Sequence, residues 1–60
     1  MKFHYGDIVE IKSGFYKGMR GRVMMHFFLF YEVNIFKTAG TWASYFFWQL
    51  KKVEYIPGEE

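Results

Sequence analysis

The sequence contains no cysteine, so disulfides and thiolate metal sites cannot stabilise this protein. No apolar run approaches the ~20 residues of a membrane-spanning helix. The first residues, MKFHYGD, lack the long apolar core of a secretory signal. We therefore expect no membrane span and a cytoplasmic location.

Residues that could support metal binding or catalysis are scarce. His4 and His26 are far apart in the sequence, and Asp7 is the only aspartate, so no spacing matches a metal site. Ser13 and Ser44 have no base near them in the sequence that could activate a nucleophile. We expect no metal, no cofactor and no enzymatic activity.

The stretch from Lys12 to Arg22 contains no acidic residue. The formal net charge of the whole chain is only +2. Four cations lie in this stretch, namely Lys12, Lys17, Arg20 and Arg22. The acidic sequence PGEE lies far from them, at residues 57–60. We expect a positive field that is local to one part of the surface.

Aromatic residues are abundant for a chain of 60 residues, which has room for a single domain over residues 1–60. Eight Phe, five Tyr and two Trp make up 25% of the sequence. Each ring would bury ~150–250 Å² if it were enclosed. One small core cannot enclose them all, so some aromatic surface should be exposed.

The residue pattern predicts short β-strands. In Asp7–Ser13, Val9 and Ile11 alternate with polar residues, which is typical of a half-buried strand. Glycine-containing segments at 14–21 and 37–40 indicate turns. The other predicted elements are a strand that begins at Arg22, strands at 31–36, 41–47 and 51–56, and a short helical turn at 48–50. This order predicts an all-β fold, a small and partly open five-stranded barrel.

The segment Gly6–Val23 resembles the KOW motif of SH3-like barrels. In that motif an alternating strand is followed by a glycine, a basic residue with glycine after it, a further glycine and a valine. The matching positions are Val9 and Ile11, Gly14, Lys17 and Gly18, Gly21, and Val23. The later segment 48–54 is similar to the closing helical turn and last strand of such barrels.

This resemblance implies an SH3-like barrel that serves as a binding module. The family occurs in large-subunit ribosomal proteins and transcription elongation factors, where the barrel contacts RNA, ribosomal protein or polymerase through its loops. The middle of the chain matches the family only in strand order. Since fold similarity assigns architecture better than function, the resemblance does not select the partner.

The glycine-rich loop is the first candidate binding site. Flexible cations can neutralise phosphates while an exposed ring stacks on an unpaired base. The candidate RNA-binding residues are Lys12, Phe15, Tyr16, Lys17, Arg20 and Arg22. The alternative is that Tyr16 packs over the end of the barrel and the cations are simply solvated.

The run Val23–Phe36 contains 14 residues without glycine or proline. As one straight strand its 14 residues would span ~46 Å, whereas a compact chain of this length has a radius of gyration of ~10 Å. We expect the chain to reverse between Met25 and Tyr31. A bulged strand with both faces covered is the alternative, and a helix is disfavoured because β-branched and aromatic residues dominate.

A reversal there places Phe27–Phe30 in a turn, where family barrels carry polar residues or glycine. Clustered exposed phenylalanines usually mark a protein interface. A strand at 41–47 would place Trp42 and Phe46 on one face and Tyr45 on the other. The candidate protein-interface residues are Phe28, Phe30, Trp42 and Phe46.

Two functional hypotheses follow. The leading one is a non-enzymatic module that engages RNA or a ribonucleoprotein complex, such as the ribosome or a transcribing polymerase, through its basic aromatic loop. The second is a protein-interaction module, either a small regulator or a homo-oligomer, that uses an exposed aromatic patch.

Overall fold

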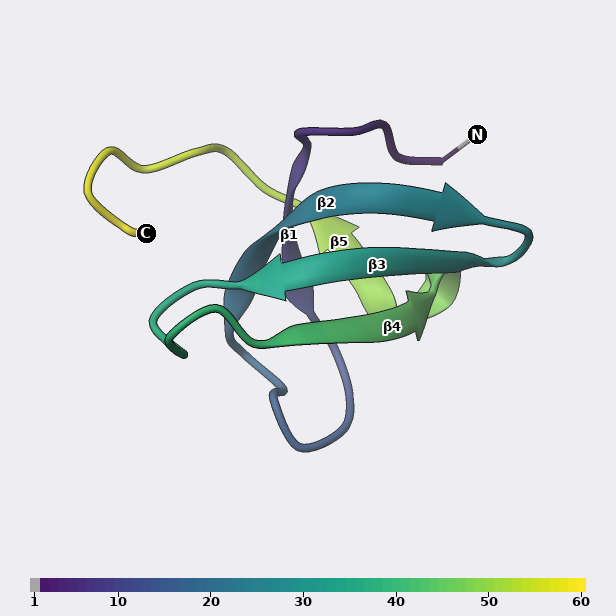
Figure 1. Ribbon diagram of the computed structural model, residues 1–60, viewed down its shortest axis with the longest axis horizontal. Helices are drawn as coiled ribbons and strands as arrows, with labels where there is room; N and C mark the ends of the chain where they lie inside the picture. Colours follow the sequence, from purple (N-terminus) through teal and green to yellow (C-terminus); the bar gives the residue numbers. More distant parts are fainter. Residues whose placement is uncertain (1) are drawn as a thin grey trace.

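The computed structural model describes residues 2–60. Five antiparallel strands form one sheet in the order β4-β3-β2-β1-β5, so β4 and β5 are its two edges and the sheet is open (Figure 1). The elements are β1 Ile8–Ile11, β2 Arg20–Phe27, β3 Phe30–Ile35, β4 Trp42–Phe46, the 3-10 turn η1 Phe47–Gln49, and β5 Leu50–Lys52. The predicted all-β class, with five strands and a short helical turn before the last one, is confirmed.

The boundaries of β2 and β5 differ from the predicted ones. β2 begins at Arg20, two residues before its predicted start, because Arg20 pairs with Glu10 of β1. The prediction of a strand over 51–56 is wrong, since β5 ends at Lys52. β5 pairs with β1 at three positions. After Lys52, the Val53 N–H still donates to the Ile8 carbonyl at 2.9 Å, and Ile8 is the first residue of β1.

The long apolar run reverses, as predicted. β2 and β3 form a hairpin in which Phe27 pairs with Phe30, so the turn consists of Phe28 and Leu29 alone. A register shift between Val23 and Met25 adds a bulge to β2. The reversal halves the span of the run and brings both of its ends into one sheet.

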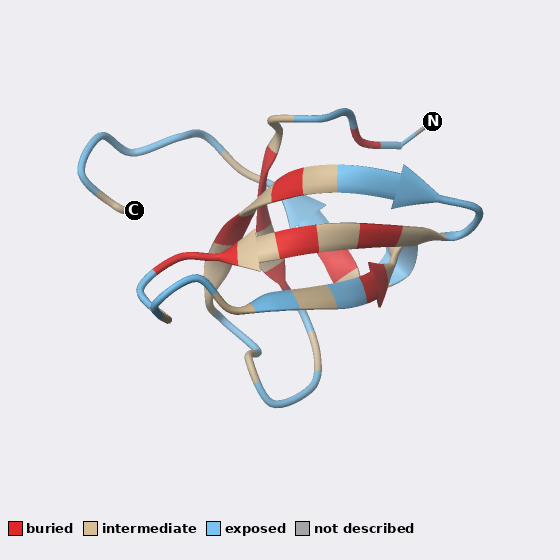
Figure 2. Ribbon diagram, in the orientation of Figure 1, coloured by how far each residue is buried: buried red, intermediate tan, exposed pale blue. Residues whose placement is uncertain are grey.

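The core lies between the two parts of the twisted sheet. In Figure 1, β1 and β5 cross behind β2, β3 and β4. Buried and less buried residues alternate along β3, with Tyr31, Val33 and Ile35 buried (Figure 2). The core cluster consists of Phe3, Val9, Ile11, Val23, Tyr31, Val33, Ile35, Tyr45 and Leu50.

Close packing at Gly21 joins β2 to β3. A Cβ atom there would lie 2.5 Å from the backbone oxygen of Asn34 and 2.7 Å from a methyl of Val33. Gly14 and Gly18, at a φ of 91° each, supply the left-handed conformations of the first loop. The glycines of the motif therefore serve backbone geometry.

Few aromatic residues enter the core. Among residues 2–60, the buried rings belong to Phe3, Tyr31, Phe36 and Tyr45. The prediction that some aromatic surface is exposed is confirmed. The exposed rings form the candidate functional sites described next.

Candidate functional site

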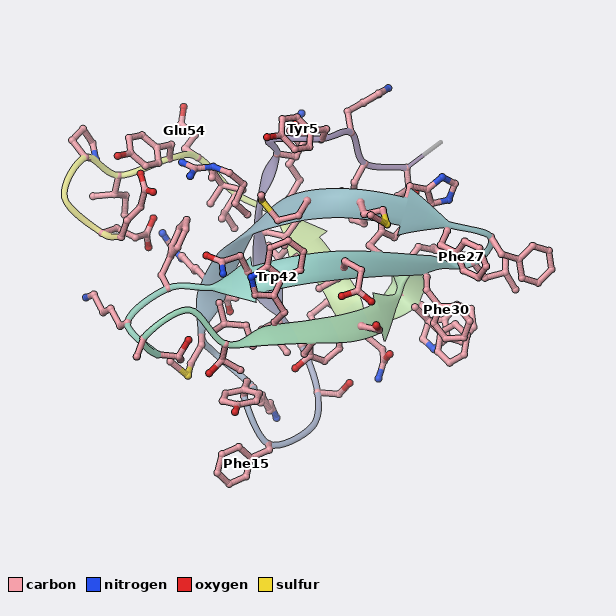
Figure 3. The ribbon with its side chains drawn as sticks, viewed as in Figure 1. Tyr5, Phe15, Phe27, Phe30, Trp42 and Glu54 are labelled. Atoms are coloured by element: carbon pink, nitrogen blue, oxygen red, sulfur yellow. The ribbon has the colours of Figure 1, made fainter. Side chains whose placement is uncertain are left out.

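The side of the β2-β3-β4 sheet that faces away from the core carries a contiguous aromatic surface, here called the outer sheet face. It surrounds a shallow cavity of about 430 Å³. In Figure 3, Phe27 and Phe30 lie near the hairpin turn and Trp42 lies toward the opposite end of the sheet. The residues that line this cavity are Met25, Phe27, Phe30, Glu32, Trp42 and Ser44.

Strand register determines which side chains share this face. Phe27 pairs with Phe30, and Phe30 pairs in turn with Phe46 of β4. Directly paired residues point to the same side of a sheet, so three phenylalanines from three strands lie in one row. Phe27 is 70% exposed and Trp42 is 50% exposed.

Stacking extends the row beyond the sheet. The rings of Phe30 and Phe46 are 4.5 Å apart, and those of Phe46 and Trp48 are also 4.5 Å apart at an interplanar angle of 6°. Trp48 belongs to η1, and the side chain of Gln49 fixes this turn. Gln49 Oε1 accepts a hydrogen bond from the Phe46 N–H at 2.9 Å, and Gln49 Nε2 donates one to Ser13 Oγ at 3.1 Å. Trp48 is therefore oriented by its neighbours although it is 53% exposed.

The hairpin turn adds apolar surface to the edge of this face. Phe28 is 76% exposed and adopts a φ of 55°. Left-handed backbone costs a non-glycine residue roughly 1–2 kcal/mol, and turns of this length usually use Asn or Gly. The turn therefore exposes a large aromatic ring to solvent and places its residue in a backbone conformation that is unfavourable for a non-glycine residue.

The outer sheet face carries one acidic side chain. The Ser44 hydroxyl donates a hydrogen bond to the Glu32 carboxylate. Among residues 2–60, neither lysine nor arginine lines this cavity. The lining of this cavity is thus largely apolar with a single carboxylate, which suits an apolar partner. Arg22 lies outside the lining, although its pairing with Asn34, which pairs with Trp42, places it on the same side of the sheet.

The structure brings together three of the four residues predicted for a protein interface. Phe30, Trp42 and Phe46 lie on the outer sheet face, while Phe28 lies at the adjoining turn. The predicted set lacked Met25, Phe27 and Trp48, which also belong to this surface. The Phe27 and Met25 positions follow from the hairpin register, which sequence pattern alone did not specify.

The glycine-rich loop presents a second exposed ring. Phe15 is 91% exposed and points away from the molecule (Figure 3). Tyr16 is half-buried against the core and meets Phe15 edge to face at 5.0 Å. Lys12 and Lys17 are exposed, and neither forms an ion pair with any residue in 2–60. Phe15 and these two cations are the accessible part of the predicted RNA site.

The two arginines of that predicted site are occupied by carboxylates. Arg22 binds Glu60 in a bidentate pair, with Nη1 to Oε1 at 2.9 Å and Nη2 to Oε2 at 3.1 Å. Arg20 lies 3.7 Å from Glu10 and 3.6 Å from Glu59. The structure thus separates the six predicted residues into a free loop and a neutralised pair.

The contact with Glu60 changes the affinities of both partners for protons. Hydrogen bonds from Arg22 and Tyr55 lower the pKa of the Glu60 carboxyl from its ordinary value. The hydrogen bond to Glu60 raises the pKa of Arg22, and the same carboxylate raises the pKa of the Tyr55 hydroxyl. Sequence reasoning noted these acidic residues but missed their contact with the arginines.

Within residues 2–60, the only helix is the 3-residue turn η1, and no helix is long and apolar enough to cross a membrane. The same residues contain no group of three or more His, Asp or Glu side chains arranged to hold a metal ion. No protein-family model, curated protein or solved structure matches this chain.

Proposed function

We propose that this protein is a non-enzymatic protein-interaction module that docks on an apolar surface of its partner through the outer sheet face and the Phe28 turn. The observation that carries the proposal is the row of rings on one side of the sheet, in which the exposed Phe27 and Trp48 flank the half-buried Phe30 and Phe46. Solitary exposed apolar residues are ordinary on soluble proteins, whereas contiguous patches mark interaction sites.

The area of this surface supports the proposal. A fully exposed ring presents ~150–250 Å², so the exposed fractions of Phe27, Phe28, Trp42 and Trp48 amount to on the order of 500 Å². A standard interface buries ~800 Å² on each partner. Together with Met25 and a polar rim, these rings can form the apolar centre of such an interface.

Electrostatics favour a protein partner at this face. Phosphates approaching the row of rings would meet Glu32 without a cation in the lining of the cavity. A protein partner needs only to cover the rings and hydrogen-bond with Ser44 and Glu32 at the centre.

The test is affinity capture with nuclease treatment. We expect the partner to be retained after nuclease digestion and lost when Phe27 and Trp42 are both replaced by serine. Phe15→Ser is the matched control, because Phe15 is even more exposed but lies on the first loop. Retention of the same partner by the double variant would contradict the proposal. Sedimentation of the purified chain separates a homo-oligomer from a partner of a different sequence.

A second function, nucleic-acid binding through the first loop, is supported by one specific observation. Phe15 extends into solvent from the loop whose sequence also carries the exposed Lys12 and Lys17, which supplies the combination of a stacking ring and phosphate contacts. The resemblance to the KOW motif adds to this proposal. Titration of the chain with a single-stranded oligouridine at low salt tests it, and Phe15→Ser should abolish the binding.

A further inference from the structure

Residues 55–60, here called the acidic segment, lie against the start of β2 and the end of β3. Arg22 stands at the centre of this contact. Its guanidinium carbon lies 5.6 Å from the ring centroid of Phe36 and 6.0 Å from that of Tyr55. Its two terminal nitrogens point at Glu60, so stacking and bidentate pairing hold the planar group in one orientation.

The neighbouring surface is shaped for a second carboxylate. A cavity of about 260 Å³ adjoins Arg20 and is occupied at one side by Glu59. Glu59 approaches Arg20 Nη1 at 3.6 Å, next to the buried ring of Phe36. Lys37 also lines this cavity and is a second cation beside Arg20, which lies 3.7 Å from Glu10 as well. The body of the protein therefore offers Arg22 and Arg20 as adjacent positions for two successive carboxylates.

The acidic segment is attached to this surface without being part of the core. It follows the last strand, and none of its residues belongs to the core cluster. Tyr55 and Ile56 are about half exposed. It contacts the body through the two arginines, which meet Glu59, Glu60 and the Tyr55 ring. The Tyr55 hydroxyl also donates a hydrogen bond to Glu60 within the segment at 2.9 Å. Detaching it would free Arg22 and would leave Arg20 with Glu10 of β1 as its remaining carboxylate partner.

We infer that Arg20, Arg22 and Phe36 form a recognition site for an acidic peptide segment of a partner protein, and that the chain's own acidic segment occupies this site as an internal competitor. The inference rests on the proposed protein-binding function but uses a different surface. The chain's own acidic segment indicates which chemistry the site would bind. The expected ligand is a peptide with an aromatic ring that stacks on Arg22 and two adjacent carboxylates that reach Arg22 and Arg20.

Competition follows from the covalent connection. A tethered segment acts at an effective concentration in the millimolar range, so a free peptide of the same sequence binds only when that segment is released. Exposed ion pairs are individually weak, which makes the release readily reversible. Removing the two internal carboxylates should strengthen binding of the free peptide roughly tenfold.

The test compares the full chain with its Glu59→Gln/Glu60→Gln variant. The probe is the acetylated, amidated peptide Tyr-Ile-Pro-Gly-Glu-Glu, and the control peptide carries glutamine at both acidic positions. Nuclear magnetic resonance titration follows the Nε–H signal of Arg22 at low salt. We expect saturable shifts in the variant at roughly tenfold lower peptide concentration than in the parent chain, and no shifts with the control peptide. Adding Arg22→Gln to the variant should abolish binding, whereas adding Lys12→Gln should not.

Three results would overturn the inference. They are equal peptide affinity in the parent chain and the variant, equal binding of the control peptide, and tighter binding at Arg22 by a single-stranded oligouridine than by the acidic peptide. The last result would identify the site as one for phosphates. Because Phe27 and Trp42 are unchanged in all these proteins, partner capture by the outer sheet face is measured separately, and either proposal can fail alone.

Discussion

The two ends of β2 present opposite surfaces. At its start, Arg20 and Arg22 are neutralised by carboxylates from the same chain. At its end, Met25 and Phe27 are exposed, and no segment among residues 2–60 covers them. Burying apolar area gains ~25 cal/mol per Å², whereas an exposed ion pair contributes ~0–1 kcal/mol. The apolar end is therefore suited to holding a partner, and the charged end to a weak contact that exchanges.

The largest expected effect concerns the apolar end. We predict that Phe27→Ser with Trp42→Ser weakens partner binding about 1000-fold, since central aromatic residues of an interface typically contribute ~2 kcal/mol or more each. Titration calorimetry with the captured partner measures the change. A loss no greater than that of Phe15→Ser would remove the distinction between the two ends.

Salt dependence tests how many cations the charged end leaves available. Binding of a single-stranded oligouridine through Lys12 and Lys17 alone gives a log–log slope of about −1.4, against about −3 if both arginines also took part. We predict that raising salt fourfold weakens binding about sevenfold. Fluorescence anisotropy gives the slope, and a value near −3 would show that the acidic segment leaves the arginines available.

Replacing Phe28 in the turn should change fold stability and partner binding in opposite directions. Asparagine tolerates the left-handed backbone that Phe28 adopts at a φ of 55°, so Phe28→Asn should raise the free energy of unfolding by about 1 kcal/mol. The same change removes an exposed ring and should weaken partner binding. Urea denaturation measures the first effect. A destabilised variant would show that the ring stabilises the fold.

The smallest expected effect is the response of the charged end to pH. Contact with Arg22 lowers the pKa of Glu60, so the folded state holds this proton less tightly than the unfolded state does. The resulting stabilisation is complete above the ordinary value of 4.5 and is lost as pH falls through the lowered value. We predict that the acidic segment detaches on acidification below the ordinary value of 4.5, as the pH falls through the lowered pKa of Glu60, while the sheet persists. The Arg22 side-chain signal reports this, and the Glu59→Gln/Glu60→Gln variant should show no transition.

Local pattern was sufficient to predict much of the fold. The alternation of Val9 and Ile11, and of Tyr31, Val33 and Ile35, predicted strands whose apolar faces form the core. The length of the run Val23–Phe36 required a reversal, which occurs at Phe28 and Leu29. The end of β5 was not predicted, because it depends on how many residues of β1 remain available for pairing.

The candidate sites were predicted as residue types but not as surfaces. Strand alternation placed Trp42 and Phe46 on one face of β4, and the pairing of Phe30 with Phe46 adds Phe30 to that face. Phe27 and Trp48 were missing from the predicted interface, because their inclusion depends on pairing between strands and on stacking against Phe46. Such contacts leave no periodic signal in the sequence.

By itself, then, the sequence determined that this chain forms short strands, that the run Val23–Phe36 bends or reverses, and that its rings outnumber the places in its core. Each of these follows from local geometry, chain length or volume. Only the tertiary structure decided which rings face outward and that Glu60 reaches Arg22 across 38 positions of the chain. The physical reason is that register and long-range charge pairing depend on which segments the folded sheet places side by side.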